Sequence, residues 1–397
     1  MSESVQKPRI RFKGFSDAWE QRKLGDIGSV SMCRRIFKEQ TSESGEIPFY
    51  KIGTFGGEAD AFISRELFDE YKDKYPYPKK GDILISASGS IGRTIEFTGK
   101  NEYFQDSNIV WLNHDEHLDN SFLKCFYSVV KWAGIEGSTI KRLYNDNILN
   151  TVITLPSIAE QKKIATYFES LDNLITLHQR KYDKLVAVKK ALLEKMFPAD
   201  GETVPKIRFK GFSDAWEQRK LGEVSESYSG GTPSVGIKEY YGGQIPFIRS
   251  AEINSETTEL FLTEEGLKNS SARLVAVGDI LYALYGATSG EVGRARLKGA
   301  INQAILAIKP NKDYDSEYLA QWLRKSKHRI IETYLQGGQG NLSGAIVKEL
   351  SADFPSLKEQ KTIGDFFRQL DNLITLHQRQ LEKLKNIKSA LLEKMFV

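Results

Sequence analysis

The chain has 397 residues, 40% of them hydrophobic, and its 56 Lys and Arg against 52 Asp and Glu leave a net charge of +4. A globular protein of two to four domains is expected, and this mild charge allows nucleic-acid binding through a local basic patch without requiring it. Two cysteines exclude a disulfide framework and a four-thiolate zinc site, and no apolar run approaches the roughly 18 residues of a membrane helix.

The N-terminal segment "MSESVQKPRI" has no apolar signal region, so the sequence predicts a cytoplasmic protein without a membrane partner. The element after it, "IRFKGFSDAWEQRKLG" at Ile10–Gly25, returns letter for letter at Ile207–Gly222. Later in each half "LDNLITLHQR" and "ALLEKMF" also occur twice. The chain is therefore a tandem duplication with a period near half its length, and the Pro- and Gly-containing segment 198–206 is its linker.

Each opening segment leads into a region that differs between the halves. Short apolar runs end there in Gly- and Ser-rich loops, as in "GDILISASGSIGR" after Lys80 and "GDILYALYGATSGEVGR" after Val277, which is typical of strands followed by turns. Helical spacing follows at Asn120–Lys131 and Ser316–Lys327. The sequence thus predicts an α/β (α+β) fold, in which a mixed α/β domain occurs twice with one strand framework and different loops.

A long helical segment closes each half. Apolar positions in Ile164–Met196 and in Ile363–Met395 step alternately by 4 and 3 residues. Such a repeat over about five heptads predicts a coiled-coil seam, on a helix roughly 57 Å long. We expect the two helices to pair antiparallel with pseudo-twofold symmetry, and His178 and His377 to fix the register of the seam rather than bind metal.

Motifs for catalysis are missing from the sequence. It has no GxxxxGK[ST] phosphate loop, no dinucleotide-binding fingerprint and no Asn/Asp-Pro-Pro-aromatic loop of amino-methyltransferases. His114 and His117 are expected in a surface loop, and Cys33 is expected to be structural. A cryptic nuclease could use Asp82 or Asp279, but each follows a Gly at a strand start, where turn chemistry explains it. We therefore predict a non-catalytic protein with no metal or cofactor of its own.

Recognition of nucleic acid is the chemistry that the loops support. Arg, Lys and Ser side chains contact phosphates, and Arg, Asn and Gln read base edges. Such residues gather in loops at equivalent places in the two halves. The candidate DNA-binding residues are Lys51, Ser88, Ser90, Arg93, Thr139, Lys141, Arg142 and Asn145 in the first half, and Arg249, Thr288, Ser289, Arg294, Gln336, Gln339, Asn341 and Ser343 in the second.

The repeated opening segment cannot read two different DNA sequences, because its copies do not differ. We expect its aromatic residues Phe12, Phe15 and Trp19 to pack the edge of the domain against the helix pair. A protein that presents the same surface twice can hold two copies of one partner. The candidate partner-binding residues are Arg22, Lys23, Arg219 and Lys220.

This order of segments resembles the specificity (S, HsdS) subunit of type I restriction-modification systems. The resemblance covers essentially the whole chain and rests on the "IPF" and "GDIL" strands, a "PSxxEQ" motif before each long helix, and the repeated helices. It implies two target recognition domains that each read one half of a bipartite target in double-stranded DNA, with the helices fixing the spacer. The implied segments are recognition domain 1 at 1–155, spacer helix 1 at 156–197, a linker at 198–206, recognition domain 2 at 207–354 and spacer helix 2 at 355–397.

The same resemblance implies the partners and their cofactors. Two methyltransferase (M) subunits would bind S-adenosylmethionine and methylate adenine, and two restriction (R) subunits would be ATP-dependent translocase-nucleases. S-adenosylmethionine, ATP and Mg are therefore expected on partner subunits and not on this chain. An alternative stays open: a stand-alone sequence-specific DNA-binding adaptor without a methyltransferase partner, which predicts stable, specific DNA binding by the purified chain.

Overall fold

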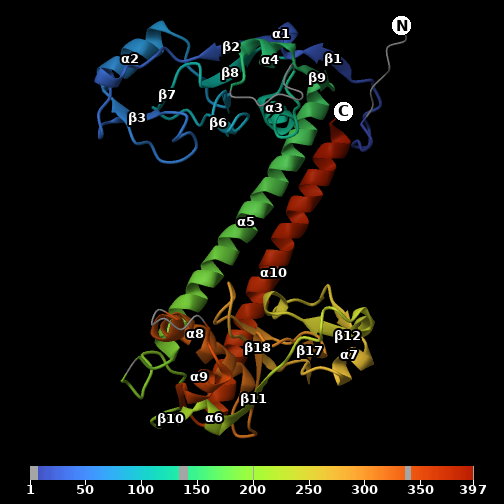
Figure 1. The fold of residues 1–397 in the computed structure, drawn as a ribbon. Helices are drawn as coiled ribbons and strands as arrows, with labels where there is room; N and C mark the ends of the chain where they lie inside the picture. Colours follow the sequence, from blue (N-terminus) through green and yellow to red (C-terminus); the bar gives the residue numbers. More distant parts are fainter. Residues whose placement is uncertain (1–7, 134–141, 200, 336–340, 397) are drawn as a thin grey trace. The chain divides into compact units, whose positions relative to one another are not determined.

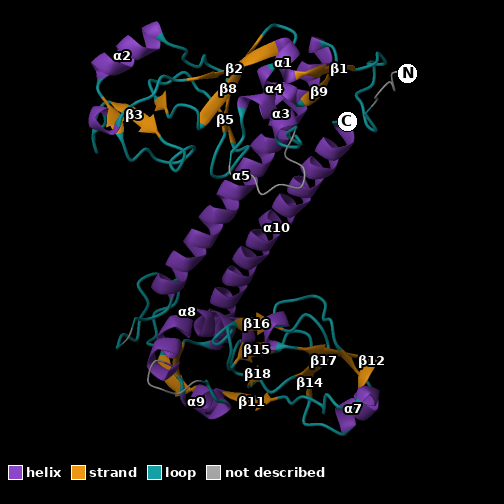
Figure 2. Ribbon diagram, turned by 45° about the horizontal axis from the view of Figure 1, so that its top comes forward, coloured by secondary structure: helices purple, strands orange, loops and turns teal. Residues whose placement is uncertain are grey.

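The computed structural model describes residues 8–133, 142–199, 201–335 and 341–396, and it divides into two compact units (Figures 1 and 2). Unit 1 extends to His178 and resumes at Gln380, whereas unit 2 spans Gln179–Arg379. Each unit thus holds one divergent region, the N-terminal part of the helix that follows it and the C-terminal part of the other long helix. No helix of the described residues combines the length and apolar character needed to cross a membrane.

The globular part of unit 1, which we call domain 1 (8–155), contains two main sheets. An antiparallel sheet has the order β2-β8-β5-β6, and a smaller sheet has the order β4-β3-β7, in which β3 and β7 are parallel. β1 pairs with β9, directly before the long helix begins. The strands are β1 (Glu20–Lys23), β2 (Gly28–Met32), β3 (Ile47–Tyr50), β4 (Phe62–Ile63), β5 (Ile83–Ser86), β6 (Thr94–Glu96), β7 (Tyr103–Phe104), β8 (Ile109–His114) and β9 (Val152–Leu155), and the short helices are α1 (Leu24–Ile27), α2 (Arg65–Lys74), α3 (Asn120–Tyr127) and α4 (Asn145–Asn150).

Domain 2 of unit 2 (207–354) repeats this plan, as the duplication predicts. Its sheet β11-β18-β15-β16 matches the first sheet of domain 1, and its second sheet, β13-β12-β17-β14, has one more strand. β10 pairs with β19 as β1 does with β9. The strands are β10 (Glu217–Lys220), β11 (Ser225–Ser229), β12 (Tyr241–Ile248), β13 (Phe261–Leu262), β14 (Arg273–Val275), β15 (Ile280–Ala283), β16 (Val292–Arg294), β17 (Gly299–Ile301), β18 (Ile305–Pro310) and β19 (Ser351–Phe354), and the helices are α6 (Leu221–Val224), α7 (Glu264–Lys268), α8 (Ser316–Leu335) and α9 (Gly344–Glu349).

One pair of equivalent helices differs in length. The helix α3 ends at Tyr127, and Ser128 after it donates a hydrogen bond from Oγ to the Cys125 carbonyl at 2.6 Å. Its counterpart α8 continues to Leu335, since its apolar face is still buried at Ile330. Residues 128–133, which follow α3, are not helical, whereas the equivalent part of α8 continues the helix.

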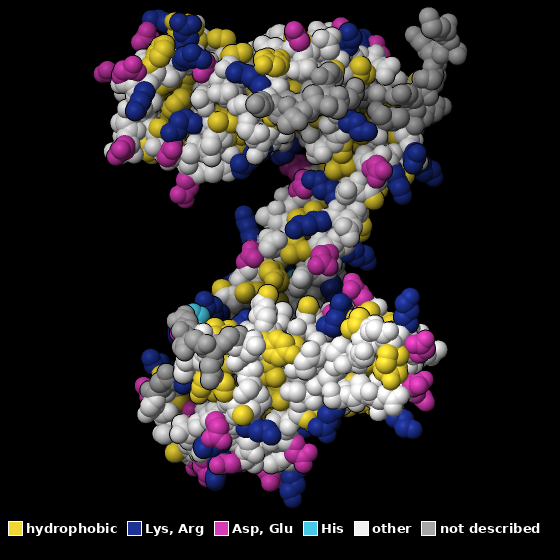
Figure 3. Space-filling view, in the orientation of Figure 1, with side chains coloured by type: hydrophobic (Ala, Val, Ile, Leu, Met, Phe, Trp, Pro, Cys, Tyr) yellow, Lys and Arg dark blue, Asp and Glu magenta, His cyan; other side chains and the backbone are white. Residues whose placement is uncertain are grey.

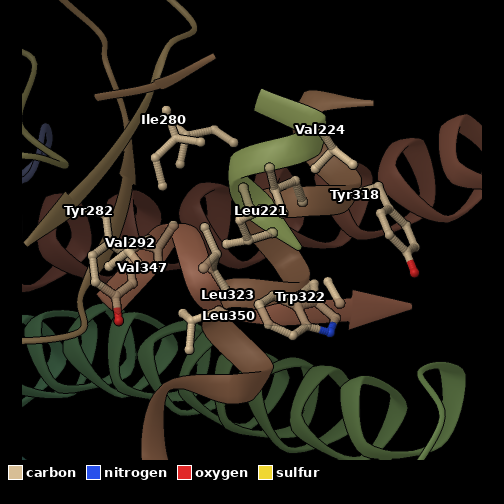
Figure 4. Close-up of a cluster of buried hydrophobic side chains, with 14 of the residues drawn as sticks. Leu221, Val224, Ile280, Tyr282, Val292, Tyr318, Trp322, Leu323, Val347 and Leu350 are labelled. Carbon is tan, nitrogen blue, oxygen red and sulfur yellow. The ribbon is translucent and has the colours of Figure 1, made fainter. Parts of the chain in front are cut away.

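The main core of domain 2 lies between the sheet β11-β18-β15-β16 and helices of the same unit (Figure 4). Ile280 and Tyr282 project from one face of β15, and α8 supplies Trp322 and Leu323. The short helix α6 adds Leu221. Burying each such side chain stabilises the fold by about 1.5–3 kcal/mol before the conformational entropy of ordering it is subtracted. The core of domain 1 has the same construction.

The predicted long helices are present as α5 (Ile158–Met196) and α10 (Leu357–Met395). Within each unit their segments run antiparallel. In unit 1 the ring centroid of Phe168 lies 6.4 Å from that of Phe396, and in unit 2 that of Phe367 lies 6.2 Å from that of Phe197. The start of one helix therefore packs against the end of the other in both units, as expected from the seam.

Two lysines, Lys189 and Lys388, lie on the same 4 and 3 spacing as the apolar positions of the long helices and form equivalent ion pairs with the opposite helix. Lys189 Nζ lies 2.5 Å from Asp371 in unit 2, and Lys388 Nζ lies 2.6 Å from Asp172 in unit 1. Burial lowers the pKa of Lys189, and the Asp371 charge opposes this shift. These partly buried ion pairs favour one register, because a slip would separate each lysine from its aspartate.

The last aromatic residue of each "ALLEKMF" repeat allows a comparison between the units. Phe197 is fully buried against Tyr318, Phe367 and Trp216, whereas Phe396 is only partly buried. We expect Phe197→Ala to destabilise unit 2 by about 3–5 kcal/mol and Phe396→Ala to cost unit 1 less. Amide hydrogen exchange resolved by peptide, measured on each variant, reports the loss of stability in each unit separately. Equal losses in the two variants would contradict the difference in packing.

Candidate nucleic-acid interface

The start of each domain is tied to its long helix by a buried ion pair. Arg11 donates from Nε and Nη2 to the two carboxylate oxygens of Glu160, both at 2.7 Å, and from Nη1 to the Asp17 carbonyl at 2.6 Å. The Glu160 side chain is 0% exposed. Arg208 and Glu359 repeat this bidentate pair in unit 2, with both distances again 2.7 Å. The Glu of the repeated "PSxxEQ" motif is thus a structural residue in both units.

The glutamine of the same motif fixes the turn that leads into α3 or α8. Gln161 Oε1 accepts from the Asp119 amide at 2.8 Å, and its Nε2 donates to the carbonyls of Pro156 and His117 at 2.9 Å. Gln360 makes the equivalent bond with the Asp315 amide at 2.9 Å. The repeated residues therefore form a common frame, which leaves the loops at the other end of the sheet free to differ.

The turn between β7 and β8 is where the loops of domain 1 meet. Ser107 in this turn has a positive φ of 48°, a conformation that few non-glycine residues adopt without support from neighbours. Support comes from four other segments of the domain, each of which makes a hydrogen bond with one residue of the turn from Gln105 to Asn108. The contacts are Ile52 N to Gln105 Oε1 (2.9 Å), Arg35 Nε to Asp106 Oδ2 (2.9 Å), Arg142 Nη2 to the Ser107 carbonyl (2.9 Å) and Ser88 Oγ to Asn108 Oδ1 (2.8 Å).

Domain 2 brings the corresponding loops together with other side chains. Thr232 Oγ1 lies 2.5 Å from Gln303 Oε1, at the turn between β17 and β18. The backbone link is shared by both domains: Leu342 N donates to the Leu284 carbonyl at 2.9 Å, as Leu143 N donates to that of Ala87 at 2.7 Å. One backbone arrangement therefore carries two different sets of polar groups. We call each meeting point of loops the loop junction of its domain.

The loop junction of domain 1 gathers several of the predicted residues. Ser88 and Arg142 are part of it, and Lys51, which pairs with Asp60 at 2.9 Å, lines a cavity of about 730 Å³ beside it. The Ser90 carbonyl accepts a hydrogen bond from the Ser86 hydroxyl. Arg93 is exposed, and its Nη2 lies 3.4 Å from the Gly56 carbonyl. Asn145 is exposed at the start of α4. Predicted residues outside the described part of the chain are Thr139 and Lys141.

In domain 2 the predicted residues are more scattered. Thr288 and Ser289 lie in the loop between β15 and β16, where Ser289 Oγ donates to the Gly286 carbonyl at 2.9 Å. Asn341 is exposed, and Ser343 caps α9 by accepting from the Ile346 amide at 3.2 Å. Gln336 and Gln339 lie outside the described residues.

Two predicted arginines of domain 2 are held by carboxylates. Arg249 donates to Glu252 and Glu259, each at 2.7 Å. The hydrogen bond to Glu252 is the main cause that raises the pKa of Arg249, and in return it lowers the pKa of Glu252 to about 2. Arg294 faces Glu317 at 3.5 Å, and burial lowers its pKa. Whether either contacts DNA stays a prediction.

A basic and aromatic loop in domain 1 was not singled out in the sequence. After β2 the chain reads "CRRIFK", with Arg34, Arg35, Phe37 and Lys38 all exposed and Phe37 56% exposed. Three of these residues line the same cavity as Lys51. Figure 3 shows Lys and Arg side chains beside exposed hydrophobic ones on the side of unit 1 where Figure 1 labels α2 and β3. An aromatic residue between basic ones directly after a strand was the signal that could have identified it.

The predicted partner-binding charges lie on the outer strands β1 and β10. Arg22 pairs with Glu20 at 2.8 Å, and Lys23 Nζ donates to Asn150 at 3.2 Å. In unit 2 the pairs are Arg219–Glu217 at 2.8 Å and Lys220–Glu349 at 2.7 Å, all exposed. Two of the three aromatic residues of the opening segment have packing partners in the structure: Phe12 lies against Tyr167 of α5, as expected, and Trp19 is buried against Phe122 of α3. The packing of Phe15 against the helices stays a prediction.

Groups that could suggest catalysis have structural surroundings. Asp82 and Asp279 accept hydrogen bonds from the amides of Lys79 and Ala276, as turn residues do. His114 Nε2 lies 2.6 Å from Asn120 Oδ1, and His117 Nδ1 lies 3.1 Å from Asp115. Across residues 8–133, 142–199, 201–335 and 341–396, no group of three or more His, Cys, Asp and Glu could hold a metal ion.

Burial raises the pKa of the Cys33 thiol to about 12, above its unfolded value of ~8.5. The neutral thiol is therefore favoured by folding: its stabilisation is complete below pH ~8.5 and is lost as the pH rises through 12. We expect native Cys33 to resist iodoacetamide at pH 8 and to react after unfolding, with Cys125, whose pKa is also raised to about 12 by burial, behaving likewise. Mass spectrometry of alkylated peptides checks this, and rapid native labelling of Cys33 would contradict it.

Comparison with known proteins places this arrangement in a family. The family model described as "Type I restriction modification DNA specificity domain" matches residues 16–187 and 213–386. A putative type I restriction enzyme specificity subunit from Haemophilus influenzae is 60% identical over 157 residues, which cover 38% of this chain and 41% of that protein. A putative MjaX specificity subunit from Methanocaldococcus jannaschii is 25% identical over 400 residues, covering 94% of this chain and 92% of that protein.

A solved structure shares the fold over nearly the whole chain. The S subunit of the type I restriction-modification system of M. genitalium superposes with a TM-score of 0.62 at 17% identity, covering 99% of both chains. Its similarity extends to the order of two mixed α/β domains and two long helices. With two matched copies of the family domain, each built around its own loop junction, the chain belongs to the family of type I restriction-modification DNA specificity domains.

Proposed function

We propose that the chain is the DNA specificity subunit of a type I restriction-modification complex, in which each domain reads one half of a bipartite double-stranded target. The observation that carries this proposal is the loop junction, which occurs twice on one backbone plan with different polar side chains. A protein that reads two unlike half-sites needs such a common frame with variable contacts. The basic and aromatic loop around Phe37 supports the same function for domain 1.

The long helices would set the spacer between the half-sites. The support is local: in each unit the helices pair antiparallel through apolar contacts and one Lys–Asp ion pair. Half-sites one turn of DNA apart are separated by about 34 Å, a distance that helices of this length can span.

Catalysis would belong to partner subunits. Two methyltransferase subunits that bind S-adenosylmethionine and two restriction subunits that use ATP and Mg would complete the complex. Two sets of exposed side chains that occur in both units support a partner present in two copies. One set is the charges of β1 and β10, and a separate set is an exposed leucine pair on each long helix, Leu174 and Leu177 in unit 1 and Leu373 and Leu376 in unit 2.

Genome-wide mapping of adenine methylation tests the function directly. Cells that express the chain with its methyltransferase subunit are expected to carry one bipartite methylated motif with a fixed spacer. A variant with Gln105→Ala and Asn108→Ala is expected to lose or relax one half-site only, because both residues lie in the loop junction of domain 1. Gln303→Ala, at the equivalent turn of domain 2, is expected to affect the other half.

Two outcomes would argue against this function. A single continuous motif would contradict two independent readers. Stable sequence-specific binding by the purified chain, with no methylation in the presence of the methyltransferase, would instead support a stand-alone adaptor.

A further inference from the structure

In unit 2, charged side chains connect the long helices to domain 2. Asp371 of α10 receives three donors: Lys189 of α5 at 2.5 Å, Gln321 Nε2 at 3.0 Å and Arg324 Nη1 at 3.4 Å, the last two from α8. The Gln321 side chain is fully buried, and its Nε2 also donates to Glu317 at 2.8 Å. One carboxylate therefore joins three helices of the unit.

The connection continues from α8 to β16, the strand that follows the loop with Thr288 and Ser289. Glu317 lies 3.6 Å from Arg324 and 3.5 Å from Arg294 of β16. Arg324 Nε also donates to the Val292 carbonyl of β16 at 3.4 Å. A further ion pair joins α8 to the preceding loop, between Lys327 and Glu291. The loop with Thr288 and Ser289 is thereby coupled to the helix pair through charged groups.

In unit 1 the ion pair Lys124–Glu96 joins α3 to β6, but among its described residues no charged contact runs from α3 to the long helices. Phe122 contacts Trp19 there as Tyr318 contacts Trp216 in unit 2, which aligns α3 with the start of α8. The counterparts of Glu317, Gln321 and Arg324 are then Ser121, Cys125 and Ser128. In the described part of unit 1, Asp172 pairs with Lys388 alone, and a cavity of about 360 Å³ lined by Ser128 and Asp172 lies at this place.

We propose that Arg324 is a positioning residue, which through Asp371 and Glu317 fixes the orientation of domain 2 on the helix pair of its unit. The inference rests on the proposed function and deepens it: the second half-site is read from a domain held by this additional network, whereas the described part of domain 1 has the Arg11–Glu160 pair to its long helix and the Lys124–Glu96 pair between α3 and β6 but no charged contact from α3 to the long helices. Partly buried charged hydrogen bonds are directional, and losing one partner leaves another charge desolvated. Rotation of domain 2 about the helices would break several of them together.

The test uses the complex reconstituted with its methyltransferase subunits and DNA duplexes whose spacer is native, or one base pair longer or shorter. Arg324→Met is expected to lower the preference for the native spacer at least about fivefold, which corresponds to roughly 1 kcal/mol of coupling. Methylation of the native target is expected to stay within about twofold, since Arg324 is not in the loop junction. Arg324→Lys keeps a donor and should recover most of the preference.

Ser128→Ala is the matched control in unit 1 and is expected to leave the preference unchanged. A second measurement does not depend on DNA: Arg324→Met should speed amide hydrogen exchange in residues 284–294, and Ser128→Ala should not do so in residues 87–93. If Arg324→Met does not fold, Asp371→Asn, which removes the charge but keeps the shape, replaces it in both assays.

The outcomes separate this inference from the proposed function. Native-spacer preference and exchange both unchanged in Arg324→Met, or changed equally in Ser128→Ala, would overturn the positioning role. Absence of any bipartite methylation by the wild-type complex would refute the function instead, and the exchange measurement would then decide the inference by itself.

Discussion

Arg11→Met is expected to destabilise unit 1 by about 3–5 kcal/mol, because it leaves the buried Glu160 carboxylate without its bidentate partner. The loss should appear as faster amide exchange in domain 1 and in the first turns of α5. Unit 2 should be unaffected, since it has its own pair of Arg208 and Glu359. Exchange resolved by peptide is the appropriate measurement, because a chain with two units need not unfold in one step.

The duplication supplies the controls for this prediction. Arg208→Met should produce the same loss in unit 2 and spare unit 1. Lys13→Met, an exposed change in the same repeated segment, should stay within about 0.5 kcal/mol of the wild type. Adding Glu160→Leu to Arg11→Met should recover much of the stability, because a buried ion pair replaced as a whole by apolar groups costs little. A neutral Arg11→Met would show that the pair does not hold the domain to its helix.

Under the proposed function, replacing Leu174 and Leu177 by Asp is expected to remove one of the two proposed methyltransferase subunits from the complex. Both leucines are exposed, at 44% and 47%, so the fold should be retained. Desolvated leucines at the centre of an interface contribute enough that two charged replacements should weaken binding at least ~100-fold. Native mass spectrometry would show the change in stoichiometry.

The second copy of the patch completes the experiment. Asp at Leu373 and Leu376 as well should abolish binding of both subunits. Val186→Asp is the matched control, because Val186 is also exposed but its counterpart in α10 is Lys385, so it lies outside the repeated surface. Loss of both subunits from the Leu174 and Leu177 variant alone would contradict two independent docking sites.

The repeated parts of the chain could be predicted from the sequence more fully than the divergent parts. The letter-for-letter repeats identified the duplication, and the alternation of 4 and 3 residues identified α5 and α10 with their antiparallel packing in each unit. Local patterns suffice there because a heptad repeat specifies both the helix and the face that it buries. The role of the repeated "EQ" was less visible, since the buried partner of Glu160 is Arg11, far away in the chain.

Only part of the candidate site could be predicted from the sequence. Ser88 and Arg142 were identified from their loops, but the turn from Gln105 to Asn108 that joins them was not. Hydrogen bonds between loops that are far apart in the chain produce no periodic pattern in the sequence, so they cannot be predicted from it. Arg294 shows the opposite case, because a loop composition that suits DNA binding also suits an arginine held by Glu317.

The sequence by itself determined the class of the protein: two mixed α/β domains on one plan, two long helices and a frame repeated without change. These features rest on interactions between residues near one another in the chain, or on repetition that can be read directly. Only the tertiary structure decided which polar groups meet at each loop junction, and that Arg324 and Asp371 connect the loop of domain 2 to the long helices of its unit. Long-range contacts make that decision, because whether a charged side chain is free for a partner depends on which distant carboxylate the fold places beside it.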